Sequence, residues 1–231
     1  MRVLRDQAFW AALPAPELAY RGPEDEQISS WPVHVWRLPR PVRLISSGPL
    51  GGGIGQRQWV LNATVHRDYA RLDPEAHLDE IASALGLTGP GVGLLTAVDV
   101  RDAVTAEDCG VRVVATVGLG HPTLAAAPPD VPEQARVAGT INIVAFLPGQ
   151  LADAALVNAV ATATEAKVQA LHEHGMSATG TATDAVVIGC LGGPPEVEPY
   201  GGPRSVWGAR LARAVHAAVR AGARQWSARM R

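Results

Sequence analysis

The sequence reads GTINIVAFL at residues 139–147, TATEAK at 162–167 and TGTATDAVVIGC at 179–190. The first and last stretches have the β-branched, apolar composition of strands. Leu151–His174 lies between them and repeats apolar residues at helical spacing, which predicts a long helix that faces a sheet. The continuous apolar run Ala185–Cys190 predicts a central strand covered on both faces. A strand, a helix and a strand in this order predict an α/β protein.

Further strands and helices are predicted on both sides of this stretch. Alternating or apolar runs predict strands at 33–38, 42–46, 58–65, 92–98 and 111–117, and helical spacing predicts helices at 74–85 and after the Gly/Pro loop 192–203. The polar segment Asp99–Gly110 is expected to be a loop. Because some strands are apolar runs and others alternate, we expect one α/β domain with a mixed sheet covered by helices at residues 31–231. An N-terminal extension at 1–30 is expected to precede it.

Composition limits the kinds of partner. The 231 residues are 47% apolar and 18% charged, which indicates a compact globular protein with a substantial core. A net charge of −2, with no basic block before the last helix, argues against nucleic acid as a partner. The sequence contains no apolar run of about 18 residues, so no membrane span is predicted. The two cysteines, Cys109 and Cys190, form no disulfide framework, so a cytoplasmic protein is expected, and assembly into a homo-oligomer is left open.

Asp184 is the first candidate for chemistry, because it precedes an apolar strand and follows Thr179, Thr181 and Thr183. A partly buried carboxylate among hydroxyl groups can anchor a substrate amine or act as a general base. The alternative is a polar cap at the start of the strand. If Asp184 is a base, its replacement by asparagine should strongly reduce turnover. Folding should be little affected, since an amide can still cap the strand.

Glu165 is the second candidate carboxylate. A glutamate in the middle of a packed helix must find a partner or a cavity. The alternative is a surface position paired with a neighbour, for which Lys167, two residues away, is poorly placed.

The glycine-rich segment after the strand at 42–46 contains Gly51, Gly52 and Gly53. Their backbone N–H groups could cradle an anion or a carbonyl oxygen, or the segment could be a tight turn that needs positive φ angles. The spacing fits neither a dinucleotide fingerprint nor a P-loop. Ser47, at the start of the segment, could be a nucleophile, a hydrogen-bond donor or a turn residue.

Metal and cofactor sites are not expected. His172 and His174 lie two residues apart on a helix and point to different faces, which is poor geometry for chelation. No other cluster of histidine, cysteine and acidic residues has ligand spacing, so we expect neither a protein-bound metal nor a cofactor.

Taken together and in order, the motifs of this chain resemble those of the adenosylcobinamide amidohydrolase family, which acts in corrinoid salvage. The resemblance covers roughly residues 35–220. The matching segments are SSGPLGGGIG at 46–55, WVLNA at 59–63, LTAVDV at 95–100, VATVGL at 114–119, GTINI at 139–143, TATEAK at 162–167 and GTATDAVV at 180–187.

The resemblance implies hydrolysis of the amide that joins aminopropanol to the corrin ring, with adenosylcobyric acid as the product. Such a reaction needs a nucleophile or activated water, donors for the carbonyl oxygen and a proton for the departing amine. The expected catalytic residues are Asp184 or Glu165 as base, with Ser47, Thr181 or Thr183 as nucleophile or as groups that position water. The expected substrate-binding residues are Asn62, Thr140, Asn142 and the amides of Gly51, Gly52 and Gly53.

Two loops depart from the family pattern, at Gly120–Pro122 and at Tyr200–Ser205. They favour one alternative, an amidase of the same fold with another substrate. A second alternative is a non-catalytic corrinoid-binding protein, which loss of Asp184 or Glu165 would have favoured, but both are present. The order of GTINI, helix and TGxxxD is also similar to that of the L-aminopeptidase/D-esterase and ornithine acetyltransferase group, which forms stacked αββα layers. Those enzymes cleave themselves to free a nucleophile, and no equivalent processing site is evident here, so the similarity predicts a layered architecture only.

Overall fold

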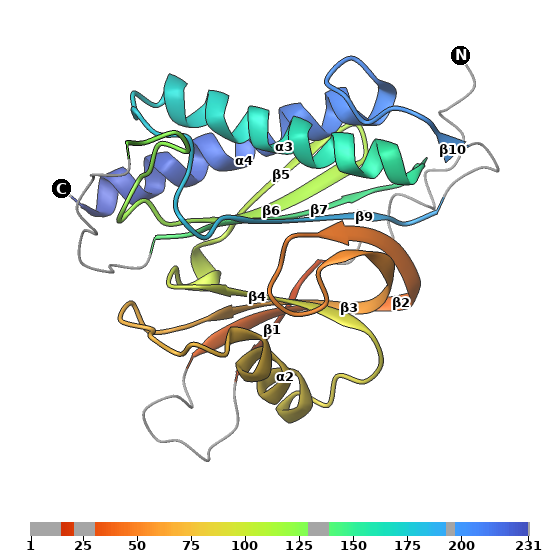
Figure 1. The fold of residues 1–231 in the computed structure, drawn as a ribbon, viewed down its shortest axis with the longest axis horizontal. Helices are drawn as coiled ribbons and strands as arrows, with labels where there is room; N and C mark the ends of the chain where they lie inside the picture. The colour runs from red at the N-terminus through yellow and green to blue at the C-terminus, as the bar shows by residue number, and fades with distance from the viewer. Residues whose placement is uncertain (1–14, 21–30, 129–138, 193–196, 231) are drawn as a thin grey trace.

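The chain folds into four layers, with two helices above two layers of strands and one helix below (Figure 1). The computed structural model describes residues 15–20, 31–128, 139–192 and 197–230. The elements are β1 (Glu17–Tyr20), β2 (Pro32–Ser46), β3 (Gly53–Thr64), α2 (Pro74–Ala84), β4 (Gly91–Thr96), η1 (Val100–Asp102), β5 (Val104–Asp108), β6 (Val111–Val117), β7 (Ile141–Leu147), β8 (Gln150–Leu151), α3 (Asp153–Glu173), β9 (Ala185–Cys190), β10 (Val197–Glu198) and α4 (Val206–Arg229).

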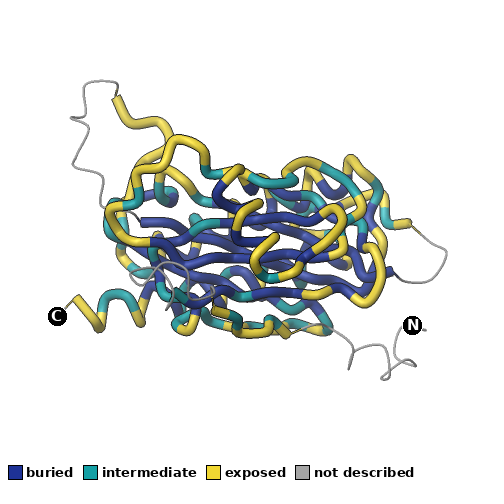
Figure 2. Tube along the Cα trace, turned by 90° about the horizontal axis from the view of Figure 1, so that it is seen from below, coloured by how far each residue is buried: buried dark blue, intermediate teal, exposed yellow. Residues whose placement is uncertain are grey.

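Three apolar clusters correspond to the three spaces between the layers. Because side chains alternate along a strand, neighbouring residues of β7 enter different clusters. Ile143 packs toward α3 and α4, whereas Phe146 packs between the two layers of strands with Trp36 of β2. Leu61 of β3 belongs to the third cluster, which lies against α2 and contains Leu78 of that helix. The strands form the buried centre and the loops the exposed rim (Figure 2). The expected αββα layering is therefore present.

The strands are hydrogen-bonded in the order β4-β3-β2-β9-β7-β6-β5, with β1 added to β2. The pairs β3–β4 and β7–β9 are parallel and the remaining pairs of this sheet are antiparallel, so the prediction of a mixed sheet is confirmed. β2 links the two layers. Its residues 43–46 pair with β9, while both halves of the strand pair with β3. All six residues of β9 are buried, as predicted for a central strand.

Two details differ from the sequence-based expectation. The strands predicted at 33–38 and 42–46 form one strand, β2, whose register with β3 shifts between Arg37 and Val42. A bulge of this kind bends a strand without ending it, so the intervening prolines did not separate two elements. The expected loop Asp99–Gly110 contains β5, an edge strand whose pairing partner is β6. Exposed and half-buried residues alternate along β5, so its sequence resembles that of a polar loop.

The expected N-terminal extension, residues 1–30, is described only at residues 15–20, where β1 pairs with β2. Residues 1–14 and 21–30 of that segment lie outside the described part. None of the described helices is long and apolar enough to cross a membrane.

Candidate active site

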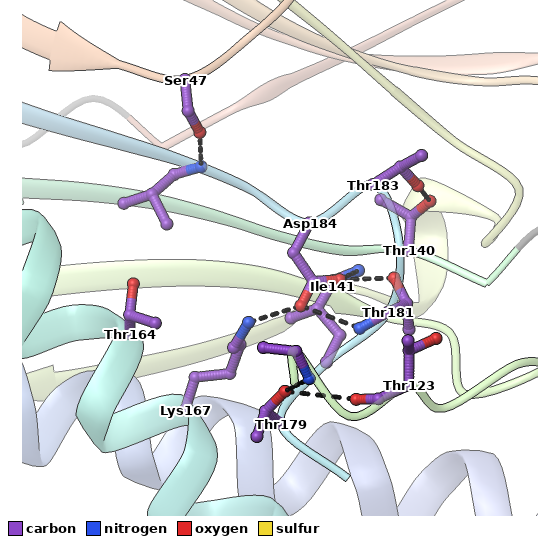
Figure 3. A network of polar contacts seen from close by, with 12 residues as sticks. Ser47, Thr123, Thr140, Ile141, Thr164, Lys167, Thr179, Thr181, Thr183 and Asp184 are labelled. Carbon is purple, nitrogen blue, oxygen red and sulfur yellow. Dashed lines mark hydrogen bonds and ion pairs between the residues drawn. The ribbon is translucent and has the colours of Figure 1, made fainter. Parts of the chain in front are cut away.

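The Asp184 carboxylate accepts four hydrogen bonds at the start of β9 (Figure 3). Its Oδ1 accepts from the backbone N–H of Ile141 at 3.0 Å and from the Thr181 hydroxyl at 2.5 Å. Its Oδ2 accepts from the Thr181 N–H at 3.1 Å and from Lys167 Nζ at 2.5 Å. The side chains of Lys167 and Asp184 are only 9% and 11% exposed. This buried ion pair fixes the 180–184 segment to α3, and the hydrogen bond from Ile141 fixes it to β7.

The number of donors changes the expected role of Asp184. Each carboxylate oxygen already accepts two hydrogen bonds, so accepting a proton from a substrate would require one donor to leave. The geometry therefore supports a positioning role, and the role of general base stays a prediction. The geometry argues against the expectation that asparagine would replace Asp184 with little effect on folding, because an amide nitrogen would face donors such as Lys167 or Thr181.

The TATEAK motif of α3 divides among different faces of the helix. Thr162 is buried, and its hydroxyl donates to the carbonyl of Gly201 at 2.9 Å. Lys167 is buried on the face toward the sheet, while Glu165 is exposed. The expectation that Glu165 must find a partner or a cavity inside the protein is wrong, since water solvates it. Sequence reasoning missed Lys167, although its spacing from the buried residues Ala163 and Ala170 places it on the apolar face.

The hydroxyl candidates surround the starts of β7 and β9 (Figure 3). Thr140, which is buried, shares a hydrogen bond of 2.8 Å with exposed Thr183. Ser47 is also exposed, and its hydroxyl accepts from the N–H of Val186 at 3.0 Å. Segments that are far apart in sequence thus meet at one end of the sheet. No hydrogen bond within the described residues links Ser47, Thr181 or Thr183 to a histidine.

The glycine segment forms a tight turn. Gly51 and Gly53 have φ angles of +65° and +82°, which glycine adopts without strain. A Cβ atom on Gly51 would lie 1.9 Å from the carbonyl oxygen of Gly91. The Gly51 carbonyl accepts from the Arg57 guanidinium at 2.8 Å, and that of Gly52 at 3.4 Å. These contacts favour the turn interpretation, and a role of Gly51, Gly52 and Gly53 in substrate binding stays a prediction.

A second group of polar side chains lies between the two layers of strands at the same end. This inter-sheet polar cluster contains His34, Asn62, Thr116 and Asn142. His34 lies opposite Asn62 in the β2–β3 register, and Thr116 lies opposite Asn142 in the β6–β7 register. Asn62 Nδ2 donates to the Thr116 hydroxyl at 3.2 Å, and Asn142 Nδ2 donates to Asn62 Oδ1 at 2.9 Å. The sequence identified the two asparagines but not His34.

Asn142 presents an acceptor in this cluster. Its Nδ2 donates to Asn62 Oδ1 and to the Leu95 carbonyl at 2.8 Å, which uses both hydrogens. Because the Leu95 carbonyl can only accept, the amide orientation is fixed. The remaining atom, Oδ1, is buried and has no partner in the described part of the chain. In this arrangement Asn142 cannot donate to a substrate carbonyl as expected, but it can accept a hydrogen bond.

The prominent cavities lie elsewhere. One of about 280 Å³ lies near the end of β9 and is bordered by Arg40, Arg43 and Asp153. Another of about 350 Å³ lies beside Tyr200 and Arg204. Neither is lined by the predicted catalytic residues.

The described residues contain no group of three or more histidine, cysteine, aspartate or glutamate side chains that could hold a metal ion.

The sequence profile of the family described as adenosylcobinamide amidohydrolase matches residues 18–231. The chain belongs to this family. It is 32% identical to the adenosylcobinamide amidohydrolase of Methanosarcina mazei over 186 residues, which cover 77% of this chain and 88% of that protein. It is 35% identical to the adenosylcobinamide amidohydrolase of Halobacterium salinarum over 186 residues, which cover 78% and 79% of the two chains.

A solved structure, the L-aminopeptidase D-Ala-esterase/amidase from Ochrobactrum anthropi, overlaps with a TM-score of 0.38 and 13% identity, covering 90% of this chain and 81% of that one. This overlap is too low to carry an argument. Membership of the adenosylcobinamide amidohydrolase family instead rests on sequence, and the family resemblance predicted from the motifs is confirmed.

Proposed function

We propose that this protein hydrolyses the amide between aminopropanol and the corrin ring of adenosylcobinamide, releasing adenosylcobyric acid. The observation that carries the proposal is the family match over residues 18–231, supported by two relatives that bear the same name. We place the chemistry at the end of the sheet where polar groups converge. Around the starts of β7 and β9, the Asp184–Lys167 pair fixes the loops, and the inter-sheet polar cluster supplies neutral groups that suit amide recognition.

Incubation of the purified protein with adenosylcobinamide, followed by liquid chromatography and mass spectrometry, tests the proposal. We expect adenosylcobyric acid and free aminopropanol in equal amounts, and neither in a heat-inactivated control. Binding of adenosylcobinamide without product would instead indicate a corrinoid-binding protein. Absence of both binding and product would indicate an amidase with another substrate.

Removal of metal ions is expected to leave turnover unchanged. Proton transfer and hydrogen bonding from side chains are sufficient for amide hydrolysis, and the only metal required by the proposal is the cobalt of the substrate. The measurement compares turnover before and after treatment with EDTA and dialysis. Loss of activity that added zinc restores would show that a protein-bound metal takes part.

The proposal places the protein in the cytoplasm. Its two cysteines, exposed Cys109 and buried Cys190, are both free thiols. Free thiols are typical of reducing compartments. Burial raises the pKa of Cys190 to about 11, so this thiol is protonated and unreactive at neutral pH. Assembly into a homo-oligomer stays a prediction that sedimentation analysis would test.

A further inference from the structure

Three buried polar atoms between the strand layers have no hydrogen-bond partner among the residues that the structure describes: Nδ1 of His34, Nε1 of Trp36 and Oδ1 of Asn142. His34 and Trp36 are two residues apart on β2 and thus face the same side, and Trp36 belongs to the inter-sheet core. Their ring centroids are 5.9 Å apart. Buried polar groups are nearly always paired in folded proteins, so three unpaired atoms in one space indicate a site for a polar guest.

His34 is the least buried member of this group. Trp36 and Asn142 are each 1% exposed, whereas His34 is half-buried. His34 therefore lies nearer the surface than Asn142, although its Nδ1 atom is itself buried. Because His34 lies opposite Asn62, and Asn62 is hydrogen-bonded to Asn142, His34 and Asn142 are both neighbours of the same asparagine.

We propose that His34 Nδ1 and Asn142 Oδ1 hold the water molecule that attacks the substrate amide, and that His34 accepts the proton of this water. The inference rests on the proposed amide hydrolysis. Both atoms are acceptors when neutral His34 carries its proton on Nε2, and water has two hydrogens to donate. The oxygen lone pairs then face the carbonyl carbon. No serine, threonine or cysteine in the described part of the chain donates to His34 Nδ1, so this histidine has no prepared covalent nucleophile.

The proton balance of the step is complete with water alone. As the water oxygen bonds to the amide carbon, one of its protons passes to His34 Nδ1, and the carbonyl π electrons move to the carbonyl oxygen. The C–N bond then breaks, and His34 returns the proton to the departing nitrogen. The products are a carboxylic acid, which ionises, and an amine, which takes up that proton.

The surroundings of His34 keep it neutral near pH 7. Burial lowers its pKa below the usual 6.5, and the Asp99 carboxylate offsets part of this shift. Asp99 is paired with Arg101 at 2.5 Å, which lowers the pKa of Asp99 and keeps it ionised while His34 titrates. The residues opposite His34 on β1 and β3 are Leu18 and Asn62, which do not titrate. A neutral base is lost on protonation, so kcat/KM should fall at acid pH with a midpoint below 6.5.

The test replaces His34 by glutamine, which keeps hydrogen-bonding groups but cannot relay a proton. We expect His34→Gln to lower kcat with adenosylcobinamide by about 100-fold or more, with KM little changed. The control is His66→Gln, which alters an exposed histidine and should leave kcat unchanged. Mass spectrometry of the intact protein during turnover should show no covalent adduct.

Three results would overturn the proposal: wild-type turnover in His34→Gln, an acyl adduct on the protein, or a crystal structure without a water bridging His34 and Asn142. If His34→Gln does not fold, the pH profile of the unmodified protein decides, and a kcat/KM that stays constant down to the pH at which the protein unfolds would exclude His34 as the base. Absence of product from the unmodified protein would refute the proposed function instead, and the bridging water would still be tested by crystallography.

Discussion

Replacement of Asp184 by asparagine is expected to lower the free energy of unfolding by about 3–5 kcal/mol, because it leaves buried Lys167 without its countercharge. Asparagine also exchanges one acceptor oxygen for an amide nitrogen, which must face donors that now converge on the carboxylate. Turnover should fall together with stability, since the 180–184 segment loses its ion pair with α3. Denaturant unfolding and turnover, measured on the same preparation, provide the test.

A double-mutant cycle separates the ion pair from other effects. The double variant Asp184→Asn/Lys167→Met should lose less unfolding free energy than the two single variants lose in sum. The coupling energy should be about 1–3 kcal/mol. Glu107→Gln is the matched control, since it removes an exposed partner of Arg112 and should change stability by less than about 1 kcal/mol. If the double variant loses as much unfolding free energy as the two single variants together, Lys167 and Asp184 do not stabilise each other.

Replacement of Gly180 by alanine is expected to disrupt the same ion pair without changing any charge. A Cβ atom at this position would lie 2.1 Å from Asp184 Oδ2 and 2.5 Å from Lys167 Nζ. The lysine can move aside, but four hydrogen bonds hold the carboxylate, so the loop must shift. We expect a loss of about 2–4 kcal/mol of unfolding free energy, within the range of severe overpacking, and a loss of turnover of at least tenfold.

Gly202→Ala is the control for this substitution. Its added Cβ would meet only the flexible amide of Asn158, at 3.1 Å, so we expect near-normal stability and turnover. Equal stability of the Gly180→Ala and Gly202→Ala variants would show that the packing around Asp184 is looser than the structure indicates.

The fold was largely predictable because its apolar patterns are strong and local. The continuous run of β9 indicated a central strand, and the apolar residues of α3 at helical spacing indicated a helix that faces a sheet. The single long strand β2 was not predictable, since prolines normally interrupt strands and only pairing with β3 shows the bulge. β5 was missed because an edge strand is half exposed and its composition resembles that of a loop.

The candidate site was predictable only where its residues are close in sequence. Asp184 and Thr181 are three residues apart, and their hydrogen bond agrees with the expected cluster. Lys167 reaches Asp184 only because α3 packs on the sheet, and the sequence offers a lysine on an apolar face as the sole indication. His34 was overlooked because strand alternation does not show which polar residue points inward when both faces of the sheet are covered.

The most direct test of the central claim is a crystal structure of the protein with adenosylcobyric acid bound. We expect the carboxyl group released by hydrolysis to lie at the end of the sheet where β7 and β9 begin, within about 3.5 Å of His34 or of a water that His34 holds. A carboxyl group bound in the cavity beside Arg40 and Arg43 would contradict the claim, because that cavity lies near the end of β9 and away from the inter-sheet polar cluster.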